Sequence, residues 1–201
     1  MKNETLMDAA LKQRLSALYR AGDRHYHDLA HIEALLSLAD EYRAALSDRE
    51  AVEAAIWFHD AIYDSRAKDN EARSADLARR SLAGRADAAR IDRIAAMIEA
   101  TATHREPDLP DTAARRDAAL FLDMDLSILG AAPAVFDAYE HAVRREYEWV
   151  DEAAWRSGRA AVLKGFLERP HIFHTRQFRE RFEDRARENM ARSLKGLAGR
   201  S

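Results

Sequence analysis

The sequence predicts an all-α fold, a single-domain helical bundle of about eight or nine helices. Only 7 Gly and 4 Pro interrupt the 201 residues, and strong helix formers such as alanine, leucine, arginine and glutamate fill most of the rest. Runs with the two-residue period of a strand are nearly absent. We predict helices at about 5–20, 27–46, 48–63, 70–83, 87–104, 112–129, 132–150, 151–169 and 175–197.

The breaks between these helices have local causes. Ala21-Gly22-Asp23 ends the first helix, and Ser47-Asp48 can cap the third. Pro107 and Pro110 force a loop after the fifth helix, and Arg169-Pro170 marks a later turn. None of these breaks is a long flexible linker and no segment repeats, so we treat residues 1–201 as one domain.

Composition excludes several classes of function. Lys plus Arg (32) nearly balances Asp plus Glu (35), so the chain lacks the basic field that binds a nucleic acid polymer. Because there is no cysteine, any metal ion must take nitrogen and oxygen ligands. The first twenty or so residues are too charged for a signal peptide, and no run reaches the roughly 18 apolar residues of a membrane span. We therefore expect a cytoplasmic protein without a membrane partner.

The expected helix over 27–46 carries two histidines on its apolar side. Leu35, Leu38 and Tyr42 mark an inward stripe, and steps back of three or four residues reach His31 and then His27. Such a pair can bind one metal ion, or one imidazole can ligate while the other orients a substrate. A purely structural pair is the alternative.

The expected helix over 48–63 repeats this pattern. Its apolar stripe is formed by Val52, Ala55, Ile56 and Ile62, and His59 falls on it with Asp60 adjacent. Burying a carboxylate among aromatic residues is costly unless the charge meets a partner or a cation. On its own the His-Asp pair is weak evidence for a metal site.

In the segment 120–130 two carboxylates, Asp123 and Asp125, interrupt an apolar run. Asp125 shares a face with Ala118, Leu122 and Leu129. A carboxylate on that face needs a base, backbone donors or a metal ion, and a core salt bridge to an arginine is the rival interpretation. Together the three places offer imidazoles and carboxylates suited to divalent Mn, Fe, Co, Ni or Zn, or less naturally Mg.

His31, the later doublet His59-Asp60 and the still later Asp125 resemble the H…HD…D signature of the HD superfamily of metal-dependent phosphohydrolases. The blocks around them resemble more closely a bacterial family of predicted HD-domain hydrolases. These blocks are Tyr26–Ile32, Trp57–Tyr63, Asp69-Asn70-Glu71 with Ser74-Ala75, and Leu122–Gly130. The resemblance continues through Arg144–Tyr147 and Arg159–Leu167, and so covers most of the chain.

The resemblance implies a phosphohydrolase that cleaves a small phosphoester, such as a nucleotide, by attack of a metal-bound hydroxide. It implies the metal ligands His31, His59, Asp60 and Asp125, with Asp123 as the alternative to Asp125. The metal-binding core then spans about 20–130 and a helical extension about 131–201. In one departure, Ala61-Ile62 follow the doublet where some HD hydrolases have Glu-Asp.

The general acid is therefore open. Glu71, His104 and Asp69 are the candidate catalytic residues, although Asp69 also suits a helix N-cap and His104 a solvated helix end. Candidates to bind an anionic substrate are Arg24, His27, Lys68, Arg73, Arg144 and Arg145. Substrate identity and oligomeric state are not encoded in these patterns, and a homo-oligomer is compatible with them.

Two other classes of function fit the same residues. An HD-fold di-iron oxygenase would need further histidines, which His27 and His104 could supply. A non-catalytic ligand-sensing or scaffold module would keep the polar residues as a buried network. Glu-x-x-His occurs only at Glu168 to His171, across Pro170, so a ferritin-like di-iron bundle is not supported.

Overall fold

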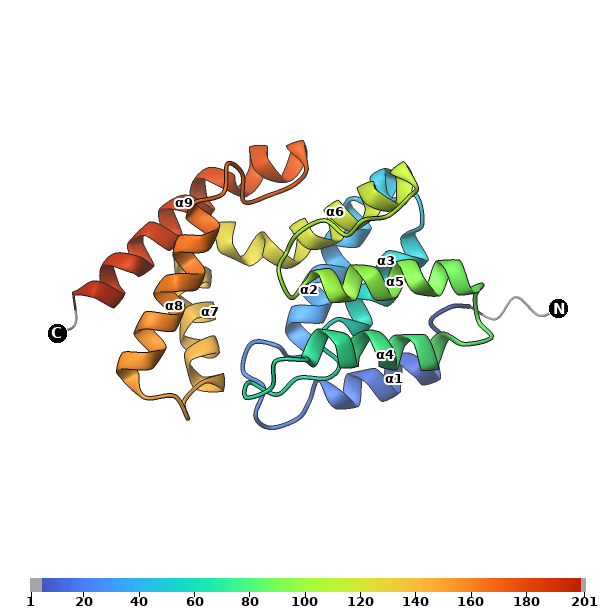
Figure 1. Cartoon of the computed structure of the whole chain (residues 1–201), viewed down its shortest axis with the longest axis horizontal. Helices are drawn as coiled ribbons and strands as arrows, with labels where there is room; N and C mark the ends of the chain where they lie inside the picture. The colour runs from blue at the N-terminus through green and yellow to red at the C-terminus, as the bar shows by residue number, and fades with distance from the viewer. Residues whose placement is uncertain (1–4, 200–201) are drawn as a thin grey trace. The chain divides into compact units, whose positions relative to one another are not determined.

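The computed structural model describes residues 5–199 and confirms the all-α class (Figure 1). Among these residues there is no named strand, and two short 3-10 segments, η1 and η2, accompany the α-helices. In order the elements are α1 (Ala9–Leu18), α2 (Leu29–Glu41), η1 (Arg43–Ala45), α3 (Arg49–Phe58), α4 (Asn70–Leu82), α5 (Ala88–Ala100), α6 (Thr112–Leu126), η2 (Ser127–Gly130), α7 (Pro133–Glu146), α8 (Glu152–Leu167) and α9 (Arg176–Ala198).

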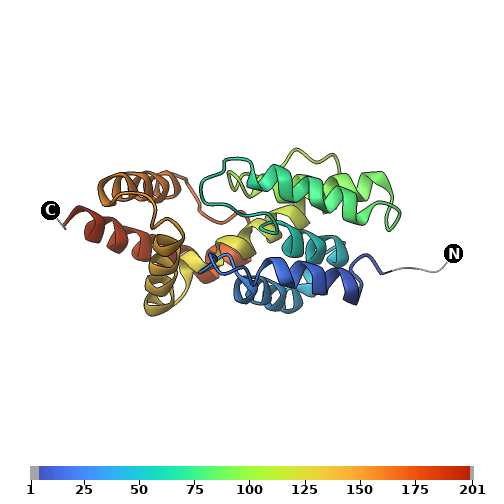
Figure 2. The ribbon, with the colours of Figure 1, turned by 90° about the horizontal axis from the view of Figure 1, so that it is seen from below.

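The chain divides into two compact units, Met1–Met124 and Asp125–Ser201, and the division falls in the last turn of α6. In the first unit α3 is the central element, since it packs against α1, α2, α4 and α5. Figure 2 shows the teal α3 between the blue α1 and α2 and the green α4 and α5. Seven of its residues are buried, from Ala51 to Phe58. The side chains at the C-terminal end of α3 therefore lie in the interior of the first unit.

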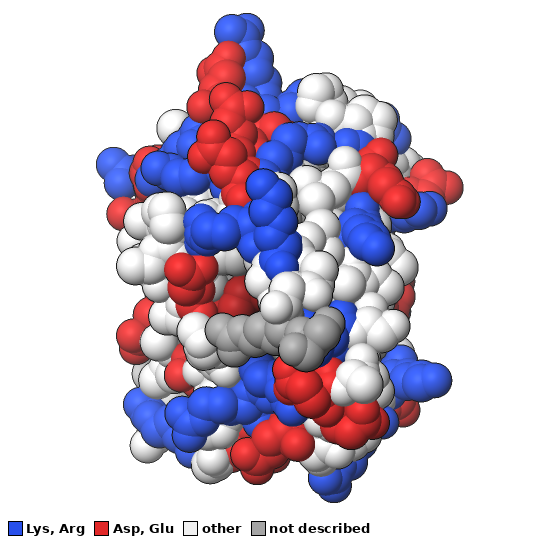
Figure 3. Space-filling model, turned by 90° about the vertical axis from the view of Figure 1, so that its left-hand side faces the viewer, with Lys and Arg blue, Asp and Glu red and all other residues white. Residues whose placement is uncertain are grey.

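In the second unit α9 packs along η2 and α8, and α7 also contacts η2. The inward face of α9 includes Phe178, Phe182 and Met190, which are all buried. The outward residues of this helix carry mixed charge. On the face of the molecule in Figure 3, Lys and Arg lie interspersed with Asp and Glu, without a broad area of one sign.

Two expected boundaries near the histidines are wrong. The second helix ends at Glu41 and a 3-10 turn follows, whereas we expected one helix over 27–46. The third ends at Phe58, not near residue 63, so His59 and Asp60 lie just beyond its last turn. There the N–H of Ala61 bonds to the carbonyl of Phe58, the i−3 pattern that closes a helix end.

In the part of the chain that the structure describes, no single helix is long and apolar enough to cross a membrane. The segments Thr112–Gly130 and Pro133–Glu146 satisfy the length and composition of a span only as a pair with a bend between them.

Candidate metal centre

His59 is held in one orientation at the end of α3. Its side chain is buried, with 1% of its surface exposed, and its Nδ1 lies 2.9 Å from the carbonyl oxygen of Ile56. Because a carbonyl can only accept, this hydrogen bond assigns a proton to Nδ1. The neutral ring then presents the lone pair of Nε2, which is the arrangement of a metal-ligating histidine with a carbonyl behind it.

His31 reaches the same point from the first turn of α2. That turn is fixed by Asp28, the N-cap of α2, whose side chain accepts hydrogen bonds from the N–H groups of Ala30 and His31. Asp28 belongs to the sequence block Tyr26–Ile32. The Nε2 atom of His31 lies 3.2 Å from that of His59. Two imidazoles thus turn the same nitrogen toward one buried point.

Asp60 adds a carboxylate beside this pair. Its Oδ2 lies 3.0 Å from Nε2 of His59 and 3.9 Å from Nε2 of His31. Burial raises the pKa of Asp60, but the positive charges of His59, His27 and His31 when their rings are protonated, and the hydrogen bond that a protonated His59 donates, outweigh it and hold that pKa well below its ordinary range; a metal cation would take the place of these protons. The carboxylate is therefore ionised, as a metal ligand must be.

The three atoms have the spacing of ligands on one ion. Atoms bound about 2.1 Å from a shared metal are roughly 3.0 Å apart in neighbouring octahedral positions and roughly 3.4 Å apart in a tetrahedron. The separations of 3.2 and 3.0 Å that involve His59 match these values, and the 3.9 Å between His31 and Asp60 is wider. Imidazole nitrogen with carboxylate oxygen is a donor set for Mn, Fe, Co, Ni or Zn.

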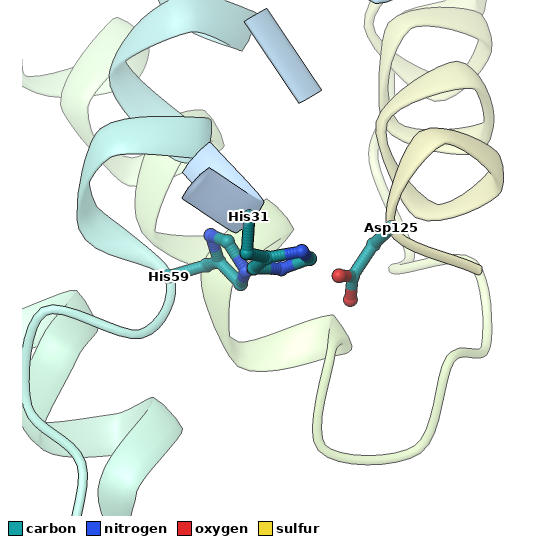
Figure 4. A group of neighbouring side chains, drawn as sticks. All are labelled: His31, His59 and Asp125. Carbon is teal, nitrogen blue, oxygen red and sulfur yellow. The ribbon is translucent and has the colours of Figure 1, made fainter. Parts of the chain in front are cut away.

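Asp125 faces the two imidazoles from the last turn of α6 (Figure 4). One of its carboxylate oxygens lies with a ring nitrogen of His31 and of His59 in a group whose members are all within 4.8 Å of one another. Phe121, one turn earlier on α6, packs edge-on to the His59 ring at 5.8 Å between centroids. Asp123, the alternative ligand, is fully buried, and neither Asp123 nor Asp60 is in this group.

His27 lies beside this centre. Its ring stacks on that of Tyr63 at 4.4 Å and stands 6.2 Å from the ring of His31. Arg24 lies close as well, but its guanidinium donates to the backbone carbonyls of His27, Asp60 and Ala61. Two of the six predicted substrate residues, Arg24 and His27, therefore lie beside the candidate metal centre, and the Arg24 guanidinium is bonded to main-chain carbonyls.

The loop after the doublet is fixed by two residues that we had not assigned to the site. The Ser74 hydroxyl bonds to both the N–H and the carbonyl of Ile62, and the Asn70 amide does the same with Asp64. Both belong to the third sequence block, so this block stabilises the chain that leaves the doublet. In the sequence, a short polar side chain on the inward face near the start of a helix could have indicated such bonds to the backbone.

The neighbouring candidates are less enclosed. Asp69 stands at the N-cap position of α4 but makes no side-chain cap hydrogen bond, and its carboxylate is 65% exposed with Arg73 3.8 Å away. Lys68 and Arg73 are exposed, and Glu71 is half-buried in the first turn of α4. Asp69 thus takes the expected N-cap position without a side-chain cap bond, and none of these four residues is in the metal-ligand group.

His104 follows α5 with a φ of 49°, and among the described residues it is the non-glycine residue with a positive φ. Its N–H bonds to the carbonyl of Ala100, so it ends the helix in the left-handed conformation that often closes helices. Histidine enters this conformation more readily than most residues. A helix-ending role thus accounts for its backbone.

In the second unit Arg144 is engaged locally. Its guanidinium donates to the carbonyls of Tyr147 and Val150 and lies over the ring of Trp155 at 5.3 Å. It therefore stabilises the turn between α7 and α8. Arg145 is exposed.

Comparisons of the chain with protein-family models, curated proteins and solved structures found no match.

Proposed function

We propose that this chain is a metal-dependent phosphohydrolase of the HD type, with a divalent ion held by His31, His59, Asp60 and Asp125. One observation carries the proposal: two buried imidazole Nε2 atoms 3.2 Å apart share their surroundings with an ionised carboxylate 3.0 and 3.9 Å away. A divalent cation would bind these lone pairs and the carboxylate charge together, in place of the protons that the rings carry in its absence. The motif spacing of the sequence supports the same ligands.

A bound divalent ion would supply Lewis acidity, activating a water molecule and neutralising charge on a phosphoryl oxygen. The chain's own part is to fix the geometry. The carbonyl of Ile56 orients His59 and the Asp28 cap orients the turn that carries His31. Asp60 contributes negative charge, and the His27 ring, stacked on Tyr63, lies beside the centre where a bound phosphoester would approach. The substrate class that fits is a small phosphoester, such as a nucleotide.

The first measurement is metal content. Wild type is loaded with Mn²⁺, Fe²⁺, Co²⁺ or Zn²⁺, freed of excess ion by desalting, and analysed for metal per chain. We expect a near-stoichiometric ion in wild type and its loss in His59→Ala and Asp60→Ala. The matched controls are His141→Ala and Asp76→Asn, which change exposed residues. Circular dichroism checks that each variant stays helical.

Activity is then measured with the preferred ion on an aryl phosphate and a panel of nucleotides. We expect phosphate release by wild type and both controls, and its loss in His59→Ala. A folded wild type that takes up no metal contradicts the proposal and leaves the non-catalytic sensing or scaffold module. A coloured iron-loaded protein that consumes dioxygen without releasing phosphate points instead to the oxygenase.

A further inference from the structure

Arg24 links two segments that are far apart in the sequence. Its Nη1 donates to the carbonyl of His27 at 2.8 Å and to that of Asp60 at 2.7 Å, and its Nη2 donates to the carbonyl of Ala61 at 3.1 Å. The first acceptor precedes α2, which carries His31, and the other two follow α3. A single planar guanidinium thus holds together the two stretches of chain that carry the imidazoles and Asp60.

The acceptors explain why a cation lies here. Carbonyl groups at the end of a helix lack partners within it and carry partial negative charge. Asp60 and Ala61 follow the C-cap of α3, so their carbonyls lie beyond its hydrogen-bond ladder and need donors from elsewhere. An arginine can satisfy several such oxygens at once because its donors form a rigid fork, which a lysine ammonium lacks.

The guanidinium is itself held between aromatic rings. Its central carbon lies 5.0 Å from the ring centre of Tyr19 and 5.4 Å from that of Tyr63. Tyr19 is 1% exposed, and its hydroxyl donates to the carbonyl of Trp57 at 3.1 Å. The contacts on both sides limit the positions that the Arg24 side chain can adopt.

We propose that Arg24 is a positioning residue of the metal centre: by bonding to the carbonyls of His27, Asp60 and Ala61 it sets the place of the Asp60 carboxylate relative to the two imidazoles. This inference rests on the proposed metal site. It assigns to Arg24 a role through the backbone, in place of the contact with an anionic substrate that the sequence predicts.

Arg24→Gln and Arg24→Lys test this role, and Arg43→Gln is the matched control because the Arg43 side chain is 64% exposed and pairs with the exposed Asp40. Calorimetric titration with Mn²⁺ measures the Kd of each folded protein. We expect Arg24→Gln to bind about 10- to 100-fold more weakly than wild type, as when an outer partner of a metal ligand is removed. Arg24→Lys keeps the charge without the fork and should fall between, and Arg43→Gln should match wild type.

Amide hydrogen exchange of the metal-free proteins supplies a second readout. Arg24→Gln should speed exchange in both 20–28 and 59–63, while Arg43→Gln changes neither. If Arg24→Gln binds Mn²⁺ as tightly as wild type, the positioning role is overturned, even where exchange is faster. If exchange in the two segments is unchanged, the link between them is overturned.

The two proposals fail in different ways. A folded wild type that binds no Mn²⁺ contradicts the proposed metal site. The hydrogen-exchange measurement then decides alone whether Arg24 joins the segments 20–28 and 59–63. A wild type that binds Mn²⁺ beside an Arg24→Gln variant with the same Kd leaves the metal site standing and removes the role of Arg24. If Arg24→Gln loses its helical circular dichroism, Arg24→Lys, which retains the cation, provides the comparison.

Discussion

The Nε2 atoms of His31 and His59 lie 3.2 Å apart in the interior of the first unit, and each imidazole is held by its own helix end. A divalent ion between them would bind the folded chain and not the unfolded one, so it should raise stability by mass action. At an ion concentration of 100 times Kd, the gain in the free energy of unfolding is about 2.7 kcal/mol.

For a domain of this size we expect that gain to raise Tm by about 5–10 °C in differential scanning calorimetry. A chelator should reverse the shift. His59→Ala should show no shift with the same ion, while His141→Ala should keep it. An equal shift in His59→Ala would mean that the ion acts at another place on the chain.

Asp48 provides a test of pH dependence outside the metal centre. It caps α3 by accepting from the N–H of Ala51, and Arg90 donates to both of its carboxylate oxygens. Burial raises the pKa of Asp48, but the hydrogen bonds from Arg90 and Ala51 and the charges of Arg90 and Arg93 lower it more, so the net shift is downward. The resulting stability is present above the unfolded-state value of about 3.9 and lost as pH falls below it.

Asp48→Asn keeps a capping side chain and removes the charge. We expect it to lower the free energy of unfolding by about 1 kcal/mol at pH 7, because the ion pair is partly exposed. Urea denaturation at pH 7, 5, 4 and 3 measures the difference between the two proteins. It should shrink as pH falls below the ordinary pKa of an aspartate toward the lowered pKa of Asp48, and a constant difference would show that the charge is not its source.

Asp117 fixes the chain that enters α3. It is 3% exposed, and its two carboxylate oxygens accept from the N–H groups of Ser47 and Asp48 at 2.8 and 2.7 Å. Asp117→Asn replaces one acceptor with an NH₂ group that faces a backbone N–H. We expect a loss of about 2 kcal/mol in the free energy of unfolding by urea, the usual cost of an unpaired buried donor.

Asp76→Asn, on the exposed side of α4, is the control for the same chemical change and should alter stability little. If Asp117→Asn were as stable as wild type, the two backbone N–H groups would have found other acceptors. The pairing of α6 with the start of α3 would then not depend on this carboxylate.

Periodicity and composition predicted the all-α class because helix formers and apolar spacing are local properties of the chain. The same spacing predicted that His31 and His59 face the interior, and both side chains are buried. The end of α3 was missed, since Ala61 and Ile62 continue the apolar pattern although the helix stops at Phe58. The role of Arg24 could not be predicted, because its acceptors are main-chain carbonyls up to 37 residues away. Since every residue has a main-chain carbonyl, the sequence does not indicate which of them accept.

The close approach of η2 and α9 in the second unit was likewise not predicted from the sequence. A Cβ added at Gly130 would lie 2.6 Å from both Cβ and the carbonyl oxygen of Phe182, closer than non-bonded atoms tolerate. Gly130 also accepts from Arg185, and Asn189 holds the carbonyls on either side of it. Gly130→Ala must therefore push the two segments apart.

We expect Gly130→Ala to lower the free energy of unfolding of the second unit by about 1–3 kcal/mol, the usual cost of overpacking. Gly158→Ala is the matched control, since Gly158 lies inside α8 with nothing within 4 Å of an added Cβ. It should stabilise the same unit by about 0.5–1 kcal/mol, because alanine is the better helix former. Urea denaturation followed by tryptophan fluorescence measures both, since Trp149 and Trp155 belong to this unit. Equal stability of the two variants would show that η2 and α9 can separate without cost.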